Sequence, residues 1–308
     1  MARYILQRVA AGVISLFVLV TITFFLMHAV PGGPFSPAEQ RNVPEQVLEQ
    51  LKAKYGLDKP VLEQYGMYLA DLLHGNMGYS FKRTDTTVNE LIGAGFPVSA
   101  RIGALAIGLS LLVGVPLGIV SAARRGKMID RVSMTCATIG ISVPSFVISV
   151  LLMFTFSVWL KILPTYGLSG WKNYILPVVC LSFGPIAYIT RLMRSSMLEV
   201  MQQDYIRTAR AKGVPELWVI AKHALRNSIL PIVTYIGPLT AGLLTGSFVI
   251  ERLFSIPGIG RYFVSSISDR DYSVILGLTI FLGAFIILCN ILVDIIYMIV
   301  DPQVKLES

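Results

Sequence analysis

Charged side chains are scarce in this sequence. Only 14% of its 308 residues are Asp, Glu, Lys or Arg, whereas a soluble domain carries about 25%. Apolar residues make up 54% of the chain and the mean hydropathy is +0.68. A chain this poor in charge cannot cover a surface that contacts water. We therefore expect most of its exterior to contact lipid.

Residues that build metal sites, disulfides and hydrolase sites are also few. The cysteines each lie in an uncharged apolar run, and the histidines are scattered; they are Cys136, Cys180, Cys289, His28, His74 and His223. Neither a disulfide framework nor a zinc cluster is expected from such spacing. The chain also lacks His-Glu-x-x-His and Gly-x-Ser-x-Gly, so protease and esterase chemistry have no basis. We expect no catalytic residue and no metal site.

A phosphate-binding loop is missing as well. Gly126-Lys127 is followed by Met128 and is not preceded by the Gly-x4 spacing of that loop. The chain is therefore expected to bind no nucleotide cofactor, and its energy must come from a partner or an ion gradient. The net charge of +8 does not indicate a nucleic-acid partner, because the charges lie between long uncharged runs instead of forming one face.

Six long uncharged runs dominate the rest of the chain. A membrane-spanning helix needs about 20 mostly apolar residues. We predict an all-α polytopic membrane protein with spans at residues 9–30, 102–123, 132–160, 174–190, 227–250 and 272–293. The fourth run is the shortest and contains Pro177 and Pro185. It reaches sufficient length if Arg191 and Arg194 extend their charged ends to the membrane interface.

The distribution of charge predicts the orientation of these spans. Six spans place both termini on one face, together with the 124–131 and 191–226 loops. That face carries 14 basic and 7 acidic residues, and the other carries 12 and 11. Because Lys and Arg are enriched in cytoplasmic loops, we expect both termini in the cytoplasm. The 31–101 and 251–271 segments are then extracellular.

Segment 31–101 has the periodicity of amphipathic helices. One predicted helix covers 44–55 and has its apolar stripe at Val47, Leu48, Leu51 and Tyr55. A second stripe consists of Tyr65, Tyr68, Leu69 and Leu72. Two interpretations are open: the helices lie on the outer leaflet or cap the bundle, or they form a docking surface for an extracellular partner.

Segment 196–226 is much longer than the 2–8 residues that usually join two helices. It is predicted to form two short helices. The first has an apolar side made by Met197, Leu198, Met201, Tyr205 and Ile206 and ends at Gly213. The second begins at Pro215 and Glu216 and continues with Leu217, Trp218, Ile220 and Ala221. Such helices fit a groove in another protein or an anionic lipid surface held by Arg207, Arg210 and Lys212. The pattern alone leaves both open.

The motif in this segment carries a family resemblance. Asp204-Tyr205-Ile206-Arg207-Thr208-Ala209-Arg210-Ala211-Lys212-Gly213, with the later Leu230-Pro231, resembles the coupling-loop signature of ABC importer permeases. The general signature has Glu and Ala where this chain has Arg207 and Thr208. That departure resembles the dipeptide, oligopeptide and nickel subfamily, and it disfavours a sugar importer.

Two further regions extend the resemblance over essentially the whole chain. Residues 31–34 (Pro-Gly-Gly-Pro) and 55–60 (Tyr-Gly-Leu-Asp-Lys-Pro) resemble the outer region of these permeases, and Gly33-Pro34-Phe35 favours the first permease of an oligopeptide system. Residues 246–251, 254–260 and 270–272 resemble the outer loop before the last span. Within the second of these, a turn with an apolar tip is formed by Phe254, Ile256, Pro257, Gly258 and Ile259. It is either an outer gate or a packed loop.

The resemblance implies a type I ABC importer fold in a bacterial plasma membrane. Its parts are a first span at 1–30, an extracellular insertion at 31–101 and a five-helix core at 102–308. It further implies a second homologous permease, two cytosolic ATPases that bind ATP and Mg²⁺, and an extracellular substrate-binding protein. The implied ATPase-coupling residues are Asp204, Tyr205, Arg207, Ala209, Arg210, Ala211, Lys212, Gly213 and Pro215. No substrate-contacting residue can be named. The alternative is a carrier that works alone and is driven by an ion gradient.

Overall fold

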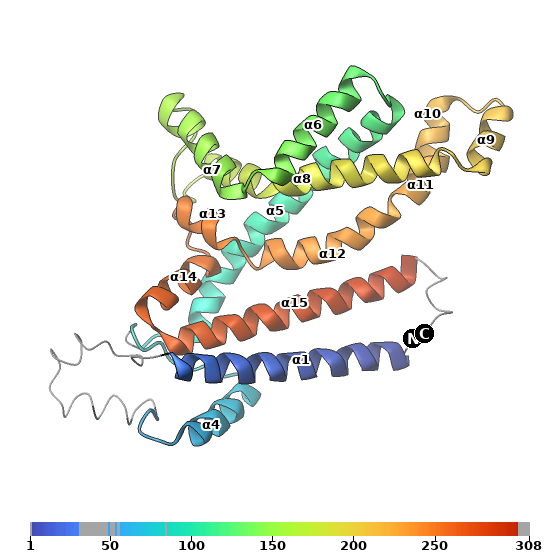
Figure 1. Ribbon diagram of the computed structural model, residues 1–308. Coiled ribbons are helices and arrows are strands. Elements are labelled where there is room, and N and C mark those ends of the chain that lie inside the picture. The colour runs from blue at the N-terminus through green and yellow to red at the C-terminus, as the bar shows by residue number, and fades with distance from the viewer. Residues whose placement is uncertain (1, 31–48, 50–52, 54–55, 84, 301–308) are drawn as a thin grey trace. The chain divides into compact units, whose positions relative to one another are not determined.

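The computed structural model describes residues 2–30, 49, 53, 56–83 and 85–300. These residues are almost entirely helical, and their only β-type pairing is an isolated bridge between Tyr79 and Thr87. Within them, five helices are long and apolar enough to span a membrane, and a bent helix pair makes a sixth candidate span (Figure 1). The all-α, multi-span prediction is confirmed. The predicted 44–55 helix and the Pro-Gly-Gly-Pro motif at 31–34 lie outside the described residues, apart from Glu49 and Ala53.

The chain divides into two compact units. One consists of residues 1–98 and 258–288, and the other consists of residues 99–257 and 289–308. Helices α5 (Val88–Ala123) and α15 (Tyr272–Val300) each contribute residues to both units.

The first unit also contains α1 (Ala2–Ala29), α4 (Val61–Leu73) and α14 (Ile259–Asp269). The predicted stripe of α4 contacts α1: the Tyr65 hydroxyl lies 2.6 Å from Thr21 Oγ1, and the Tyr65 ring centroid lies 5.2 Å from that of Phe24. This part of the stripe is therefore occupied within the chain.

The second unit is built around α8 (Lys172–Val200), which packs against α6 (Met128–Ser142), α7 (Ser145–Met153) and α12 (Leu230–Leu244). Small residues bring these helices close together. A Cβ atom on Gly140 of α6 would lie 2.8 Å from Cβ of Ala187, and one on Gly118 of α5 would lie 2.6 Å from Cβ of Met193. The remaining helices of this unit are α9 (Asp204–Ala211), α10 (Glu216–Trp218), α11 (Leu225–Ser228) and α13 (Phe248–Leu253).

The third predicted span is not one straight helix. It consists of α6, then α7 with a π-helical continuation at Phe154–Trp159, and the two parts are bent by 105°. Pro144 has no backbone N–H and disfavours helical geometry in the residue before it. Val143 is accordingly extended, with φ −85° and ψ 126°. The apolar pattern continues across this break, so hydropathy alone did not predict it.

Two other helices are longer than their apolar runs. Helix α5 begins at Val88, 14 residues before the predicted span at 102, because Arg101 interrupts the apolar run without interrupting the helix. Helix α8 passes through Pro177 and Pro185 and continues to Val200. Met197 and Leu198 therefore belong to α8 and not to the first short helix of the next segment.

Candidate coupling site

The coupling segment, residues 204–216, begins as a new helix after α8 ends. Met201 closes α8, and Gln203 is extended with ψ 150°, which separates the two helices. Helix α9 then runs from Asp204 to Ala211. Asp204 lies in its first turn, where a negative charge is favourable against the helix dipole, and Arg210 lies in its last turn, where a positive charge is favourable.

Gly213 ends α9, as the sequence predicts. Its φ of +75° lies in the left-handed region, which glycine adopts without steric cost. The Gly213 amide donates to the Arg210 carbonyl at 2.9 Å, and the Val214 amide donates to the Ala209 carbonyl at 3.2 Å. These two bonds form a Schellman motif. The turn redirects the chain toward α10, which begins after Pro215.

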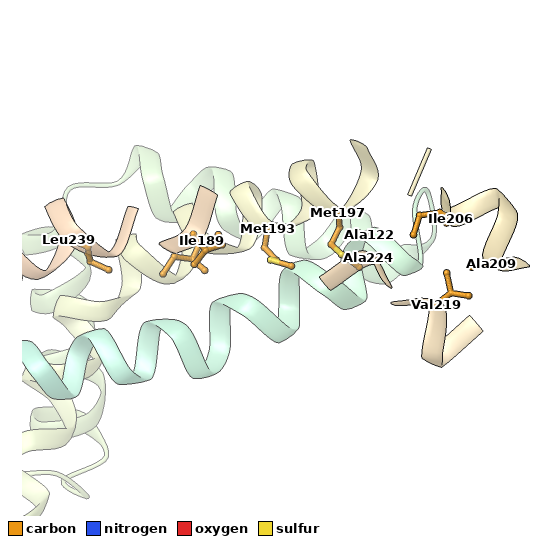
Figure 2. Packing of buried hydrophobic residues seen from close by; sticks show 10 residues of the cluster. Ala122, Ile189, Met193, Met197, Ile206, Ala209, Val219, Ala224 and Leu239 are labelled. Atoms are coloured by element: carbon orange, nitrogen blue, oxygen red, sulfur yellow. The ribbon is translucent and has the colours of Figure 1, made fainter. Parts of the chain in front are cut away.

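One side of the segment is anchored in the hydrophobic core of its unit. Ile206 and Ala209 of α9 are buried, and they belong to the same cluster as Val219 and as Met193 and Met197 of α8. Figure 2 shows Ile206, Ala209 and Val219 near the end of α8, where Met197 is labelled. One close-packed apolar cluster therefore joins α9 to α8.

The second short helix exposes residues that the sequence pattern assigned to its apolar side. Leu217 and Trp218 are 81% and 62% exposed, whereas Val219 and Ala224 are buried. The chain is π-helical at Val219–Ala224, and a π-helix closes its turn with an i to i+5 bond. Val219 and Ala224, five residues apart, therefore share the buried side. The α-helical period used to interpret the sequence could not predict that Val219 and Ala224 share a buried side.

The opposite side of the segment is exposed and polar or small. It includes most of the predicted coupling residues, namely Asp204, Tyr205, Arg207, Arg210, Ala211, Lys212, Gly213 and Pro215. Ala209 is the exception, since it is buried. Apart from Gly213 and its two chain neighbours, no heavy atom of the described chain lies within 4 Å of the position that a Gly213 Cβ would take. The surface around Gly213 is therefore open to a partner.

An ion pair joins the two short helices. Arg210 donates from Nε to Glu216 Oε2 at 3.1 Å and from Nη2 to Oε1 at 2.6 Å. The bonds from Arg210 lower the pKa of the Glu216 carboxyl, and those to Glu216 raise the pKa of Arg210. A second pair, Asp204 with Arg207, is longer at 3.5 Å and highly exposed, so it contributes little. Asn227 Nδ2 donates to the Tyr205 hydroxyl at 2.8 Å and holds α9 from its other end.

A partly buried ion pair, which the sequence pattern did not predict, lies farther back along α8. Arg194 donates from Nε and Nη2 to Asp130 at 2.5 and 2.9 Å. Asp130 also accepts from Ser121 Oγ at 2.5 Å and from the Gly126 amide at 2.8 Å. Arg194 was expected only to reach the membrane interface. Instead it joins α8 to the 121–130 turn.

The apolar side chains of the predicted turn at 254–259 are buried. Phe254, Ile256 and Ile259 are fully buried, Gly258 is buried, and Pro257 is exposed. The Phe254 carbonyl accepts from the Gly167 amide at 3.0 Å. The two interpretations of this turn, an outer gate and a packed loop, both stay predictions.

No cluster of three or more His, Cys, Asp or Glu that could hold a metal ion occurs in the described part of the chain. The coupling segment and its surroundings contain an anchored helix, an open surface and two ion pairs that join neighbouring segments.

Comparison with solved structures gives the fold. The structure is similar to a permease chain of the MetNI methionine ABC transporter in an inward-facing conformation, with a TM-score of 0.55 and 17% identity. The match covers 68% of this chain and 96% of that chain. At this identity the likeness shows a type I ABC importer fold and no more.

Comparison with known sequences gives the family. The model of the binding-protein-dependent transport system inner membrane component matches residues 114–306, and the model of the N-terminal part of such components matches residues 1–102. The dipeptide transport system permease protein DppB of Bacillus subtilis is 44% identical over 100% of this chain and 99% of its own length. The oligopeptide transport system permease protein OppB of Salmonella typhimurium is 44% identical over 99% of this chain and all of its own length. The chain therefore belongs to the family of binding-protein-dependent transport system inner membrane components.

Proposed function

We propose that the chain is a permease subunit of an ATP-driven peptide importer and forms half of its translocation pore. Its full-length relatives are named as dipeptide and oligopeptide permeases at the same identity. Peptides are therefore the cargo class, without a preferred length. The subunit itself performs no catalysis. The alternative, an ion-driven carrier that works alone, gains no support from these relatives.

The proposed partners are a second homologous permease, two cytosolic ATPases that bind ATP and Mg²⁺, and an extracellular substrate-binding protein. The coupling segment docks in a cleft of one ATPase. Nucleotide-driven closure of the ATPase pair then displaces α9, and the packed core passes this displacement to α8. In thermodynamic terms the permease has two states, and the nucleotide shifts their populations through this contact.

One observation carries the coupling proposal: α9 is anchored on one side and open on the other. Ile206 and Ala209 are packed into the core, while Ala211, Lys212 and Gly213 are exposed. Leu217 and Trp218 add an exposed apolar patch beside them. A helix on the outside of a protein with small and apolar exposed residues matches helix-in-groove recognition.

The proposed localisation is the bacterial plasma membrane, with both termini in the cytoplasm. The excess of Lys and Arg on one set of loops supports this orientation. It places the coupling segment in the cytosol, where an ATPase can reach it.

Purification tests the proposal directly. The chain is expressed from its own gene neighbourhood with an affinity tag and purified in mild detergent. We expect two ATPase subunits and a second permease to co-purify, and peptide uptake into proteoliposomes to require all of them together with ATP. Peptide uptake by the isolated chain under an ion gradient would support the alternative instead.

The two interpretations of the turn at 254–259, an outer gate and a packed loop, need a separate test, since Ile256 is buried in this conformation. A cysteine at Ile256 is expected to react with an impermeant maleimide faster in the ATP-bound complex than in the nucleotide-free complex. The exposed neighbour Pro257, changed to cysteine, provides the reference rate. Equal reactivity of the Ile256→Cys variant in both states would identify the turn as a packed loop.

A further inference from the structure

A cavity of about 360 Å³ lies within the second unit, where the third span is bent. Ligand pockets in proteins have volumes of about 300–1,000 Å³, so a small ligand fits. The wall consists of the end of α6, the start of α7, the middle of α8 and one residue of α12. Figure 1 shows α6, α7 and α12 around α8. The residues that carry the argument are Ile141, Ser145, Tyr188 and Tyr235.

The bend leaves backbone groups of this wall without partners. In a continuous helix the Gly140 carbonyl would accept from residue 144, but Pro144 has no N–H. Within the described chain, the carbonyls of Gly140 and Ile141 accept no hydrogen bond, and Ile141 is 44% exposed. Unpaired backbone groups at the depth of a membrane are tolerated where they line a water-filled cavity. Broken helices of this kind line transport sites.

Three hydroxyl groups of the wall are accessible and unpaired. The side chains of Ser145, Tyr188 and Tyr235 form no hydrogen bond with any residue that the structure describes. Tyr188 is 42% exposed, Ser145 is exposed, and the Tyr235 hydroxyl is not among the buried unpaired atoms. The two tyrosine rings form one aromatic surface, with centroids 4.3 Å apart and planes inclined by 35°. A ligand in the cavity can therefore donate to and accept from this wall.

The lining residues restrict the charge of that ligand. Among the described residues, no charged side chain lines the cavity. An ionised group placed there would have no counter-charge, and burying such a group is costly. The peptide bond is neutral and carries one donor and one acceptor. Its N–H matches the Ile141 carbonyl or a phenol oxygen, and its C=O matches a hydroxyl of Ser145, Tyr188 or Tyr235.

We propose that this cavity is a subsite for the cargo, in which an uncharged stretch of peptide backbone binds. The inference rests on the proposed function of the chain as a peptide permease and adds the place and the chemistry of cargo contact. Phe183 and Tyr188 lie near the middle of α8 (Lys172–Val200), and transporter sites at broken helices lie near the midplane of the membrane. Because every peptide has the same backbone, such a subsite admits cargo of varied sequence.

Added charge tests the site through cargo preference. The complex of this chain with its co-purifying subunits and its binding protein is reconstituted in proteoliposomes, and ATP-driven uptake of Ala-Lys-Ala and Ala-Glu-Ala is measured. Ser145→Asp should raise the ratio of lysine to glutamate peptide about fivefold or more over the wild type, and Ser145→Lys should lower it by a similar factor. The binding protein is the same in every sample, so its own preference cancels.

Thr138 provides the matched control, since it is an exposed residue of α6 outside the cavity. Thr138→Asp and Thr138→Lys should keep the ratio of the wild type. Uptake of neither peptide by the wild-type complex would refute the proposed function itself. Uptake by the wild type, with an unchanged ratio in both Ser145 variants, would overturn the subsite alone.

A cysteine variant tests the site without added charge. Ser145→Cys is made in a chain whose three native cysteines are replaced by alanine. The peptide Ala-Cys-Ala is supplied as a thiopyridyl disulfide, so attack by the protein thiolate joins the peptide to the protein and releases thiopyridone. The rate is divided by the rate with dipyridyl disulfide, which corrects for the intrinsic reactivity of each thiol.

This relative rate should be about tenfold or more higher for Ser145→Cys than for Gln202→Cys, because a bound peptide is held next to the thiol. Gln202 is exposed before α9 and lies outside the cavity. Equal relative rates would overturn the proposal. An unreactive Ser145→Cys would also overturn it and would show that lipid or the second permease fills the cavity.

Discussion

Gly213 shows how a single residue can be predicted from the sequence for two different reasons. Its position after a basic helical turn predicts the end of α9, and the left-handed φ of +75° confirms it. The family motif assigns the same glycine to contact with an ATPase. The open space around it agrees with that role, but a turn would need glycine even if nothing docked there.

Two substitutions of Gly213 distinguish its role in the turn from a role in contact with an ATPase. Asparagine tolerates the left-handed region, whereas valine does not, so Gly213→Val should destabilise the chain by about 1–2 kcal/mol and Gly213→Asn by less. If an ATPase packs against this position, both variants should insert normally, yet lose most peptide uptake while ATP hydrolysis by the assembled complex continues. Uptake and hydrolysis are measured in the same proteoliposomes.

Gly126 provides the control for this experiment. It has φ +77° and open space around its Cβ position, as Gly213 does, but it lies in a different turn. Gly126→Asn is expected to keep uptake coupled to hydrolysis. Normal coupling in Gly213→Asn would show that the glycine serves the turn alone.

The ion pair between Arg210 and Glu216 has a definite pH dependence. Because Arg210 lowers the pKa of Glu216 in the folded chain, the pair's contribution is complete above the ordinary glutamate pKa of about 4.3. This contribution is lost as the pH falls through the lowered pKa that Glu216 has in the folded chain. Both side chains are partly exposed, so the contribution is about 0.5 kcal/mol.

We therefore expect the wild type to unfold at a slightly higher temperature than Glu216→Gln at pH 6 to 8, with a constant difference across that range. The difference should vanish in acid, below the folded pKa. Asp204→Asn, which removes the longer pair, should have a smaller effect. A difference that grew with acidity would show that the sign of the pKa shift is wrong.

At the scale of helices, prolines were the least predictable feature. Pro144 breaks a span by 105°, whereas Pro177 and Pro185 lie inside a continuous α8. The residue type is the same in each case. Neighbouring helices and side chains can compensate for a missing amide in a membrane helix, and that compensation depends on tertiary packing. The existence of the spans was predictable from apolar runs, but their continuity was not.

The buried Asp130 was missed for a related reason. It lies in a short, highly charged turn, where the pattern indicates only an exposed loop. In the structure it accepts from Arg194, Ser121 and Gly126 and joins α8 to the ends of α5 and α6. These bonds connect Arg194 of α8 with the end of α5 and the first turn of α6.

Asp130 accepts hydrogen bonds from Arg194, Ser121 and Gly126, so position 130 requires an acceptor. Asp130→Asn should leave Arg194 without its counter-charge and destabilise the chain by about 3 kcal/mol. The reversed pair, Asp130→Arg with Arg194→Asp, should not restore stability, because Ser121 and Gly126 both donate and would face a cation. Thermal unfolding in detergent measures both effects. Glu199→Gln, at an exposed position on α8, is the control and should be nearly neutral. Full recovery in the reversed pair would mean that only the charge pairing matters.

At the scale of the whole molecule, the number of spans and the family were predictable, since both depend on local sequence. Six apolar runs correspond to the five long helices and the bent pair, and the coupling motif indicated the family to which the chain belongs. The sequence left two interpretations open for the turn at Phe254 and Ile256, because burial depends on which distant segments meet.

The orientation in the membrane is the proposal on which the coupling mechanism depends, and it can be decided with two positions. Gln202, next to α9, and Ser169, between the bent pair and α8, are both exposed. Each is changed to cysteine in a chain whose three native cysteines are replaced by alanine. In intact cells an impermeant maleimide should label Ser169→Cys and not Gln202→Cys, and permeabilisation should make Gln202→Cys reactive. Labelling of Gln202→Cys from outside would place the coupling segment beyond the reach of a cytosolic ATPase, whatever its local structure. The positive charge of its neighbouring loops would then need an explanation other than membrane orientation.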